Sequence, residues 1–128
     1  MTQAILAEGA YAAASTPIRT ERGTEYAAFQ KITAALARAS RSGAPMAERA
    51  AALHDNRRLW TTLATDLASA DNALPQPLRA QLFFLAEYSL LQSRAALRDV
   101  AAITPLIDVN RSVMRGLAGS DIGSDAAP

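Results

Sequence analysis

The single histidine is the first residue to test for chemistry, because histidine is the commonest general acid or base. His54 is followed directly by Asp55, but neighbouring helix residues point in different directions. A Ser-His-Asp arrangement is geometrically possible, but no serine stands on a sharp strand-to-helix turn. The chain has no cysteine, no metal-binding His or Glu spacing, and six glycines that form no phosphate loop. We therefore predict that the protein is not an enzyme, that it has no cofactor or metal site, and that His54 lies on a helix surface.

The arginines are the second group to consider. Residues 19–58 carry eight basic and four acidic side chains, and Arg49, Arg57 and Arg58 could form one basic helix face of the kind that contacts nucleic acid. The net charge of the whole chain is only +1, however, and no aromatic residues are interleaved with these arginines. The sequence therefore favours arginines that solvate the outside of the protein, with RNA binding as the alternative.

Two asparagines and a tryptophan stand in helical stripes that are otherwise apolar. Asn56 lies between Leu53 and Trp60, and Asn110 lies among the apolar residues of a later helix. A buried amide without a hydrogen-bond partner costs about 1–3 kcal/mol. Each asparagine must therefore pair either within the chain, for example with the backbone near Asn72, or with a bound partner. Trp60 is similarly either a core residue or an anchor for a partner.

Helices must position these residues, since the chain has 30 alanines and 15 leucines but three valines, a composition that favours helix over sheet. The apolar spacing and the prolines and glycines predict where the helices begin and end. A weak helix is predicted at about 3–14, and a second runs from a cap at Thr20 to about Arg41, with Gly43 left-handed beyond it. Further helices are predicted at 46–70, at 75–102, and from a cap at Thr104 to Gly119. This layout predicts an all-α fold, a small antiparallel bundle of four to five helices. One domain would cover residues 1–119, followed by a disordered tail at 120–128.

The helix predicted at 75–102 is apolar on two sides. Leucines share the first side with Ser89 and Ser93, which we interpret as small residues that let helices approach closely. The second side holds Phe84, Tyr88, Leu91 and Ala95, and polar strips separate the two. A helix with two apolar sides is either central in its bundle or has one face for a partner.

No stretch of the chain approaches the roughly 18 apolar residues that a membrane span requires. No Lys or Arg precedes Arg19, so the start of the chain lacks the basic region of a secretory signal. We therefore expect a cytoplasmic protein that does not contact membranes.

The spacing of the unusual residues resembles a known family, the flagellar biosynthesis regulator FlaF of alphaproteobacteria. The resemblance covers about residues 10–118. It rests on Leu53-x-x-Asn56-Arg57-x-Leu59-Trp60, Asp66-Leu67, Asn72-x-Leu74-Pro75-x-x-Leu78-Arg79-Ala80 and Pro105-Leu106-Ile107-x-x-Asn110-x-x-Met114-x-Gly116-Leu117. Tyr11 and Thr24-Glu25-Tyr26-x-x-Phe29 also fit it.

This resemblance implies a small helical protein needed for flagellin production and export. Members of the family work with FlbT, a regulator that restrains flagellin translation, and they act as chaperones specific for flagellin secretion. Because the terminal regions of flagellin are amphipathic helices that stay unpaired until assembly, a bundle with a surplus apolar face is suited to hold one of them. A structural subunit that only stabilises FlbT is a simpler alternative.

From these features we expect a flagellin-binding groove between the helices at 46–70 and 75–102. Asn56, Trp60 and Leu63 would form one wall, and Phe84, Tyr88 and Leu91 the other. Arg79 would be a charged residue at its rim.

Overall fold

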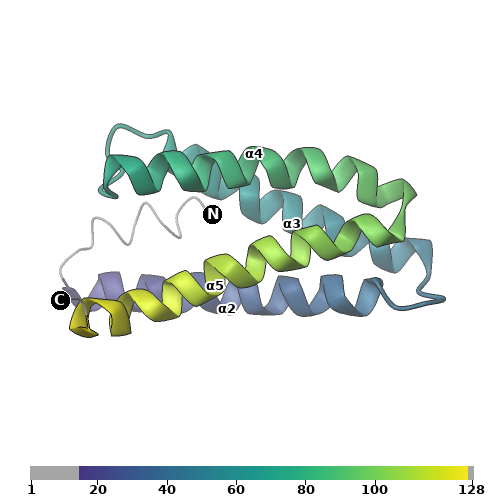
Figure 1. Cartoon of the computed structure of the whole chain (residues 1–128), viewed down its shortest axis with the longest axis horizontal. Helices are drawn as coiled ribbons and strands as arrows, with labels where there is room; N and C mark the ends of the chain where they lie inside the picture. The colour runs from purple at the N-terminus through teal and green to yellow at the C-terminus, as the bar shows by residue number, and fades with distance from the viewer. Residues whose placement is uncertain (1–14, 127–128) are drawn as a thin grey trace.

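The computed structural model describes the backbone of residues 15–126 and the side chains of residues 25–116. The helix predicted at 3–14 lies outside the described residues. The described chain is helical from end to end, with short connections (Figure 1). Its elements are α2 (Ser15–Ala39), α3 (Met46–Leu67), α4 (Gln76–Arg98), a short 3-10 helix η1 (Val100–Ala102) and α5 (Ile103–Ala126).

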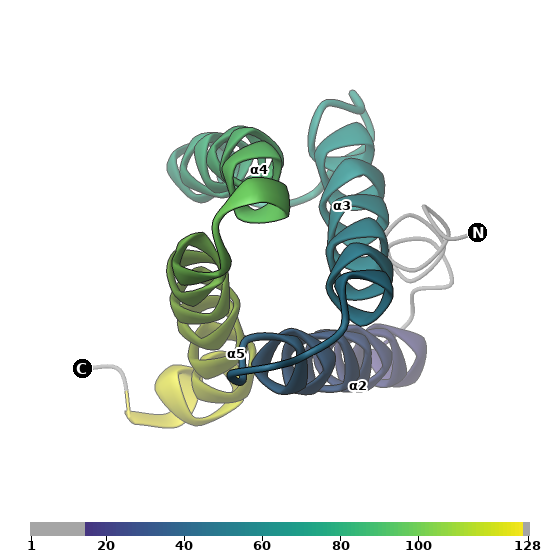
Figure 2. The ribbon, with the colours of Figure 1, turned by 90° about the vertical axis from the view of Figure 1, so that its right-hand side faces the viewer.

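Consecutive helices run in opposite directions and occupy the four corners of a square (Figures 1 and 2). Each helix packs against the next one along the chain, and α5 closes the bundle against α2. Helices α2 and α4 lie diagonally opposite each other (Figure 2). The prediction of an all-α antiparallel bundle is therefore confirmed. No helix in the described part of the chain is long and apolar enough to cross a membrane.

The first described helix begins five residues before the predicted cap at Thr20. Pro17 is the third residue of α2, where a missing N–H is harmless because the first N–H groups of a helix have no internal partner. The helix ends at Ala39, slightly earlier than expected, and Gly43 has the predicted left-handed backbone, with φ of +83°. Across this turn, Arg41 forms an ion pair of 2.8 Å with Glu48.

The junction of α4 and α5 differs from the prediction of one helix through residue 102. Asp99 adopts an extended backbone that ends α4, and its carboxylate accepts a hydrogen bond of 3.0 Å from Ala101 N–H. An aspartate that bonds the backbone two residues on makes a local turn that competes with helix. Asp99, rather than the predicted Thr104, therefore separates the two helices.

The last helix is longer than expected. It was predicted to end at Gly116 and Gly119 and to be followed by a disordered tail at 120–128, but α5 continues to Ala126. Glycine costs a helix only about 1 kcal/mol relative to alanine, whereas proline costs about 3 kcal/mol. No proline follows until Pro128, so nothing in this segment stops the helix.

The core consists of two apolar clusters separated by a polar layer. The first surrounds the α2–α3 turn and the α4–α5 junction, and contains Leu36, Ala39, Ala52, Leu53, Ala96, Ile103, Leu106 and Ile107. The second contains Phe29, Trp60, Leu63, Leu67 and Ala86. Along every helix, buried polar residues stand between the members of the two clusters: Thr33 in α2, Asn56 in α3, Ser89 and Ser93 in α4, and Asn110 in α5.

Candidate helix-binding surface

The most deeply buried side chains of helix α4 are small, whereas Leu82, Leu85 and Leu90 pack against the second cluster while only partly buried. The buried residues of α4 are Ala86, Ser89, Ser93 and Ala96, each at most 1% exposed. The Ser93 hydroxyl donates a hydrogen bond of 2.7 Å to the Ser89 carbonyl oxygen. The distance between packed helices depends on the side chains at the contact, so this seam lets α4 approach the bundle closely. The structure thus supports the structural interpretation of the two serines.

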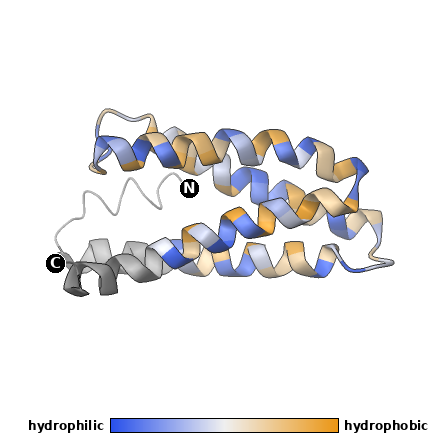
Figure 3. Cartoon of the chain, in the orientation of Figure 1, coloured by the Kyte–Doolittle hydropathy of each residue, from blue (hydrophilic) through white to orange (hydrophobic). Residues whose placement is uncertain are grey.

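The opposite face of α4 carries large apolar side chains into solvent. Phe84 and Leu91 are 64% and 66% exposed, Tyr88 is half-buried and Ala95 is exposed. Their 4-3-4 spacing places all four on one line of the helix, which we call the outer stripe. Figure 3 shows apolar residues at many positions along α4. The second apolar side of this helix is confirmed as an exposed face.

Exposed apolar residues are normal when scattered, but a concentration of them marks an interaction site. Among the described side chains, seven large apolar ones are exposed, and only Met46 lies outside residues 78–100. The others are Leu78, Phe83, Phe84, Leu91, Leu97 and Val100. Helix α4 and the short segment after it therefore carry six of the seven exposed large apolar side chains that the structure describes.

A hollow of about 340 Å³ lies beside the outer stripe, between α3 and α4. Leu90 and Leu91 supply its apolar part. The other residues that line it are Arg57, Thr61, Glu87 and Arg94. The outer stripe thus has a charged hollow along its border with α3.

The predicted α3 wall of the groove is wrong, because its residues lie in the core. Asn56 and Trp60 have no exposed surface, and Leu63 is 9% exposed. The small inner seam of α4 leaves the centre of the bundle to be filled by other helices, and α3 fills it with its largest side chains. The predicted α4 wall of Phe84 and Leu91 is exposed as expected, but it borders a shallow hollow instead of a groove lined by Trp60.

Asn56 and Trp60 belong to a buried hydrogen-bond network centred on Asn110. Trp60 Nε1 donates to Asn110 Oδ1 at 2.9 Å, and Asn110 Nδ2 donates to Asn56 Oδ1 at 2.8 Å and to Thr33 Oγ1 at 3.1 Å. The network joins α2, α3 and α5. The Trp60 ring also packs edge-on against Phe29, with ring centroids 5.6 Å apart.

The intramolecular interpretation of the two asparagines is therefore supported, but with a different partner. They bond to each other instead of to the backbone near Asn72. Thr33 was not predicted as a member of this network, although it stands between Phe29 and Leu36 in an apolar stripe, the same signal that singles out Asn56. Within the described residues, Asn56 Nδ2 has no hydrogen-bond partner, so the network is not fully satisfied.

The corner between α3 and α4 is held by three polar residues: Asp66 of α3, Asn72 of the turn and Arg79 of α4. Arg79 donates from Nε and Nη2 to the carbonyl oxygen of Leu67, at 3.3 and 3.1 Å. Asn72 Nδ2 donates to the Asp66 carboxylate at 3.0 Å, and Asn72 Oδ1 accepts from Leu74 N–H. These bonds end α3 at Leu67, three residues earlier than predicted. Arg79 therefore caps a helix and is not the expected rim of a groove.

Asp66 is a buried acid in this corner. It is 6% exposed, and burial raises the pKa of its carboxyl group, an effect that the hydrogen bond from Asn72 partly opposes. Because desolvation disfavours the charged form, burial of the ionised Asp66 carboxylate in this corner costs free energy of folding.

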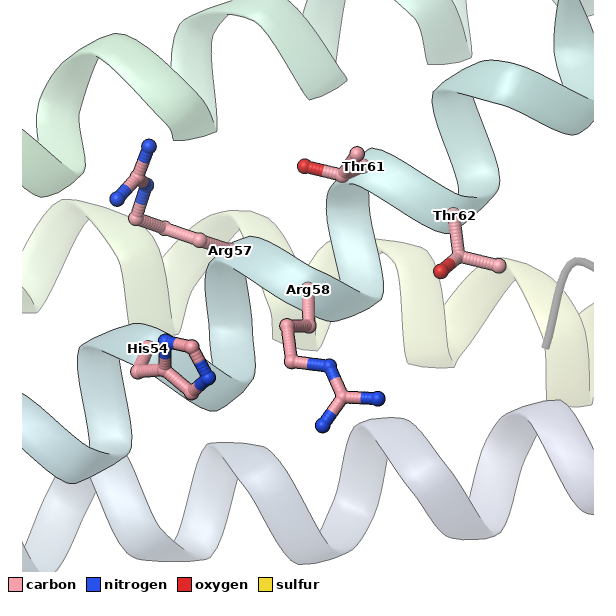
Figure 4. A pocket seen from close by; sticks show the side chains of 5 residues that line it. All are labelled: His54, Arg57, Arg58, Thr61 and Thr62. Atoms are coloured by element: carbon pink, nitrogen blue, oxygen red, sulfur yellow. The ribbon is translucent and has the colours of Figure 1, made fainter. Parts of the chain in front are cut away.

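The basic residues of α3 do not form the single face that was considered. Arg57 and Arg58 are exposed and line an open hollow of about 350 Å³ with His54, Thr61 and Thr62 (Figure 4). In that view Arg57 extends toward α4 and Arg58 toward α2. Arg49 is half-buried, because it lies four residues before Leu53 on the side of α3 that faces the core.

His54 is exposed, as predicted. No group of three or more His, Cys, Asp or Glu residues that could hold a metal ion occurs among the residues whose side chains the structure describes.

The fold and this surface define a small four-helix bundle that presents an apolar face of one helix to solvent. The sequence profile of the family described as flagellar protein FlaF matches residues 7–117, and the chain belongs to this family. The resemblance inferred from the motifs is thereby confirmed. Searches of curated proteins and of solved structures found no similar protein.

Most of the motif residues have a structural role in the bundle. Asn56, Trp60 and Asn110 form the buried network, and Asp66, Asn72 and Arg79 form the α3–α4 corner. The outer stripe of α4 lies outside the motifs.

Proposed function

We propose that this FlaF-family chain is a cytoplasmic flagellin-binding protein that acts as a secretion chaperone and adaptor. In this role it promotes the synthesis and export of flagellin. The observation that supports the proposal is the outer stripe, with Phe84 and Leu91 about two-thirds exposed on a helix whose inner seam is made of small residues. Phe84, Tyr88 and Leu91 remain the proposed contacts, whereas Asn56, Trp60, Leu63 and Arg79 stabilise the bundle.

The proposed mechanism is the packing of one helix against another. An amphipathic helix is recognised through anchors at i, i+3 or i+4, and i+7, which is the spacing of Phe84, Tyr88 and Leu91. A terminal segment of flagellin laid along this stripe would bury its own apolar face. That burial would prevent flagellin from associating with itself before export.

The test is a pull-down of flagellin by the full chain and by the double variant Phe84→Asp/Leu91→Asp. Both residues are more than 60% exposed, so the variant should fold normally, which circular dichroism checks. We expect flagellin binding to be lost, because two charges would lie in the centre of the apolar contact.

Met46→Asp is the matched control, since Met46 is 54% exposed and lies at the start of α3, outside the outer stripe. This variant should bind flagellin as the wild type does. Unchanged binding by a folded Phe84→Asp/Leu91→Asp variant would exclude α4 as the binding face.

We propose FlbT as the second partner. Feedback on flagellin translation requires that the free and flagellin-bound forms of this chain bind FlbT with different affinities, because a ligand shifts an equilibrium only by differential affinity. Measurement of FlbT binding with and without saturating flagellin tests this. Equal affinities would reject the feedback, and copurification with FlbT alone, together with no flagellin binding, would favour the simpler structural role.

A second candidate function is binding of this protein to the flagellin messenger RNA. The observation in its favour is the pair of exposed arginines, Arg57 and Arg58, along the hollow of α3 (Figure 4). Nucleic-acid affinity falls steeply with salt when several phosphates are contacted. Filter binding of the messenger at two salt concentrations should therefore show a steep dependence that Arg57→Ala/Arg58→Ala reduces, and salt-independent or absent binding would exclude this function.

A further inference from the structure

The two borders of the outer stripe differ in charge. On the border with α3, Arg57 and Arg94 line the hollow, and Arg98 follows Arg94 by one helical turn. On the other border the residues are Gln81 and Gln92, which are neutral, and Asp99, which is acidic and caps the C-terminal end of α4. The apolar face thus has one basic flank and one flank on which α4 carries no basic residue.

The basic flank is available for binding. Arg57 and Arg94 are exposed on different helices and face the same hollow. Neither guanidinium makes a hydrogen bond or an ion pair within the described part of the chain. Glu87 is the only acidic residue that lines the hollow, so it does not balance the three arginines of the flank.

We propose that the outer stripe binds an amphipathic helix that is acidic along one flank. Its apolar residues would cover Phe84, Tyr88 and Leu91, and its carboxylates would lie over the hollow, within reach of Arg57 and Arg94. The inference rests on the proposed function, for which it names the chemistry of the bound segment. It also gives that segment an orientation, because only one flank of the stripe attracts carboxylates.

Charge complementarity favours such a helix over a second copy of this chain. A second copy docked antiparallel through its own outer stripe would bring three arginines and one glutamate to a flank of the same composition. Like charges placed together across an interface oppose binding, whereas carboxylates over guanidinium groups form the strongest class of ion pair.

The inference is tested with the full-length chain and two synthetic helical peptides that share one apolar stripe at 4-3-4 spacing. One peptide carries Glu along one flank, and the other carries Lys at the same positions. Fluorescence anisotropy at low and high salt measures their affinities. We expect the Glu peptide to bind at least about tenfold more tightly at low salt, a difference of two exposed ion pairs or more, and the difference to shrink at high salt.

The variant Arg57→Glu/Arg94→Glu should reverse this preference while circular dichroism stays unchanged, because both side chains are exposed. Arg111→Glu is the matched control, since Arg111 is an exposed arginine of α5 that does not line the hollow. It should leave the preference for the Glu peptide intact.

Each other outcome overturns the inference in a distinguishable way. If both peptides bind equally and only Phe84→Asp/Leu91→Asp abolishes binding, the acidic flank is wrong but the docking face stands. If neither peptide binds although flagellin is still held through the outer stripe, the flank chemistry is again wrong. If flagellin is also not bound there, the proposed function fails with it.

A dimer that Leu91→Asp dissolves would assign the stripe to a second copy, and displacement of the Glu peptide by a short single-stranded RNA would assign the hollow to nucleic acid.

Discussion

Helices α3 and α4 have nearly the same length, 22 and 23 residues, but they use their large side chains in opposite ways. Helix α3 turns Leu53, Trp60 and Leu67 into the core, each at most 2% exposed. Helix α4 turns Ala86 and Ser89 inward and places its largest residues outside. Two helices in contact with each other thus make unequal contributions to the same core.

This difference shows that an apolar stripe alone does not reveal which side of a helix faces the core. Both sides of α4 are apolar, and the fully buried positions on its inner side are occupied by small residues. Close packing explains the choice: the interior must be filled without overlap, and once Trp60 occupies the centre only small residues fit opposite it. The larger side of α4 is left exposed, which is why we assign it to a partner.

The largest difference in stability between α3 and α4 variants is expected when one aromatic residue in each helix is truncated to alanine. Trp60→Ala should lower the free energy of unfolding by about 3–5 kcal/mol, because the ring is fully buried and packs on Phe29. Phe84→Ala should change it by no more than about 0.5 kcal/mol. Urea unfolding followed by circular dichroism measures both values. Similar losses for the two variants would mean that Phe84 belongs to the core and that α4 has no free face.

Truncation of either buried asparagine to alanine should lower the free energy of unfolding in proportion to the number of hydrogen bonds that the asparagine makes. Asn110→Ala removes three hydrogen bonds and leaves Trp60 Nε1 buried without an acceptor, so we expect a loss of about 3 kcal/mol. Asn56→Ala removes one bond together with the unpaired Nδ2 group, and should cost about 1 kcal/mol. Urea unfolding of both variants is the measurement, and equal losses would contradict a network centred on Asn110.

The small inner seam of α4 should be intolerant of a larger residue. Ala86→Leu adds bulk at a fully buried position and should destabilise the protein by about 1–3 kcal/mol. Ala95→Leu makes the same change on the outer stripe, where Ala95 is exposed, and should have little effect on the unfolding midpoint. If Ala86→Leu is equally harmless, the seam is loose, and the contrast between the two faces of α4 is weaker than the structure indicates.

The sequence predicted the parts of the fold that depend on local pattern. Apolar periodicity located α3 and the second face of α4, and glycine chemistry located the left-handed turn at Gly43. It also showed that Asn56 and Asn110 needed partners. It could not show that they would partner each other, because residues 54 positions apart meet only after the helices have packed.

The errors in the site have the same physical origin. A position on a helix fixes the direction of a side chain relative to its own helix, but not the helix that will cover it. Trp60 is predicted on a groove wall but lies in the core. Its exposure depends on the size of the residues opposite it in α4, which the sequence of α3 alone does not show. Arg79 was placed at a rim because its bond to Leu67 depends on the path of the intervening turn. Asp99 was overlooked because its short-range hydrogen bond competes with a helical pattern that was otherwise continuous.

The corner that joins α3 to α4 offers the smallest and most specific test of the comparison. Burial raises the pKa of Asp66 in the folded protein, whereas in the unfolded chain it should titrate near the ordinary value of about 3.9. The folded state therefore holds this proton more tightly than the unfolded state. The contribution of Asp66 to stability is greatest below about pH 4 and decreases as the pH rises through the pKa of the folded state.

Asp66→Asn should remove this pH dependence, because the amide oxygen can still accept the hydrogen bond from Asn72 but carries no charge to bury. We expect the variant to be at least as stable as the wild type at pH 7, and to lose its relative advantage as the pH is lowered toward 4. Urea unfolding midpoints across this range measure the difference, and Asp71→Asn, which changes an exposed acid of the same turn, is the matched control. A variant that is less stable than the wild type at pH 7 would show that the Asp66 charge strengthens the corner. The end of α3 would then depend on a charge-assisted hydrogen bond from Asn72 to the ionised Asp66 carboxylate.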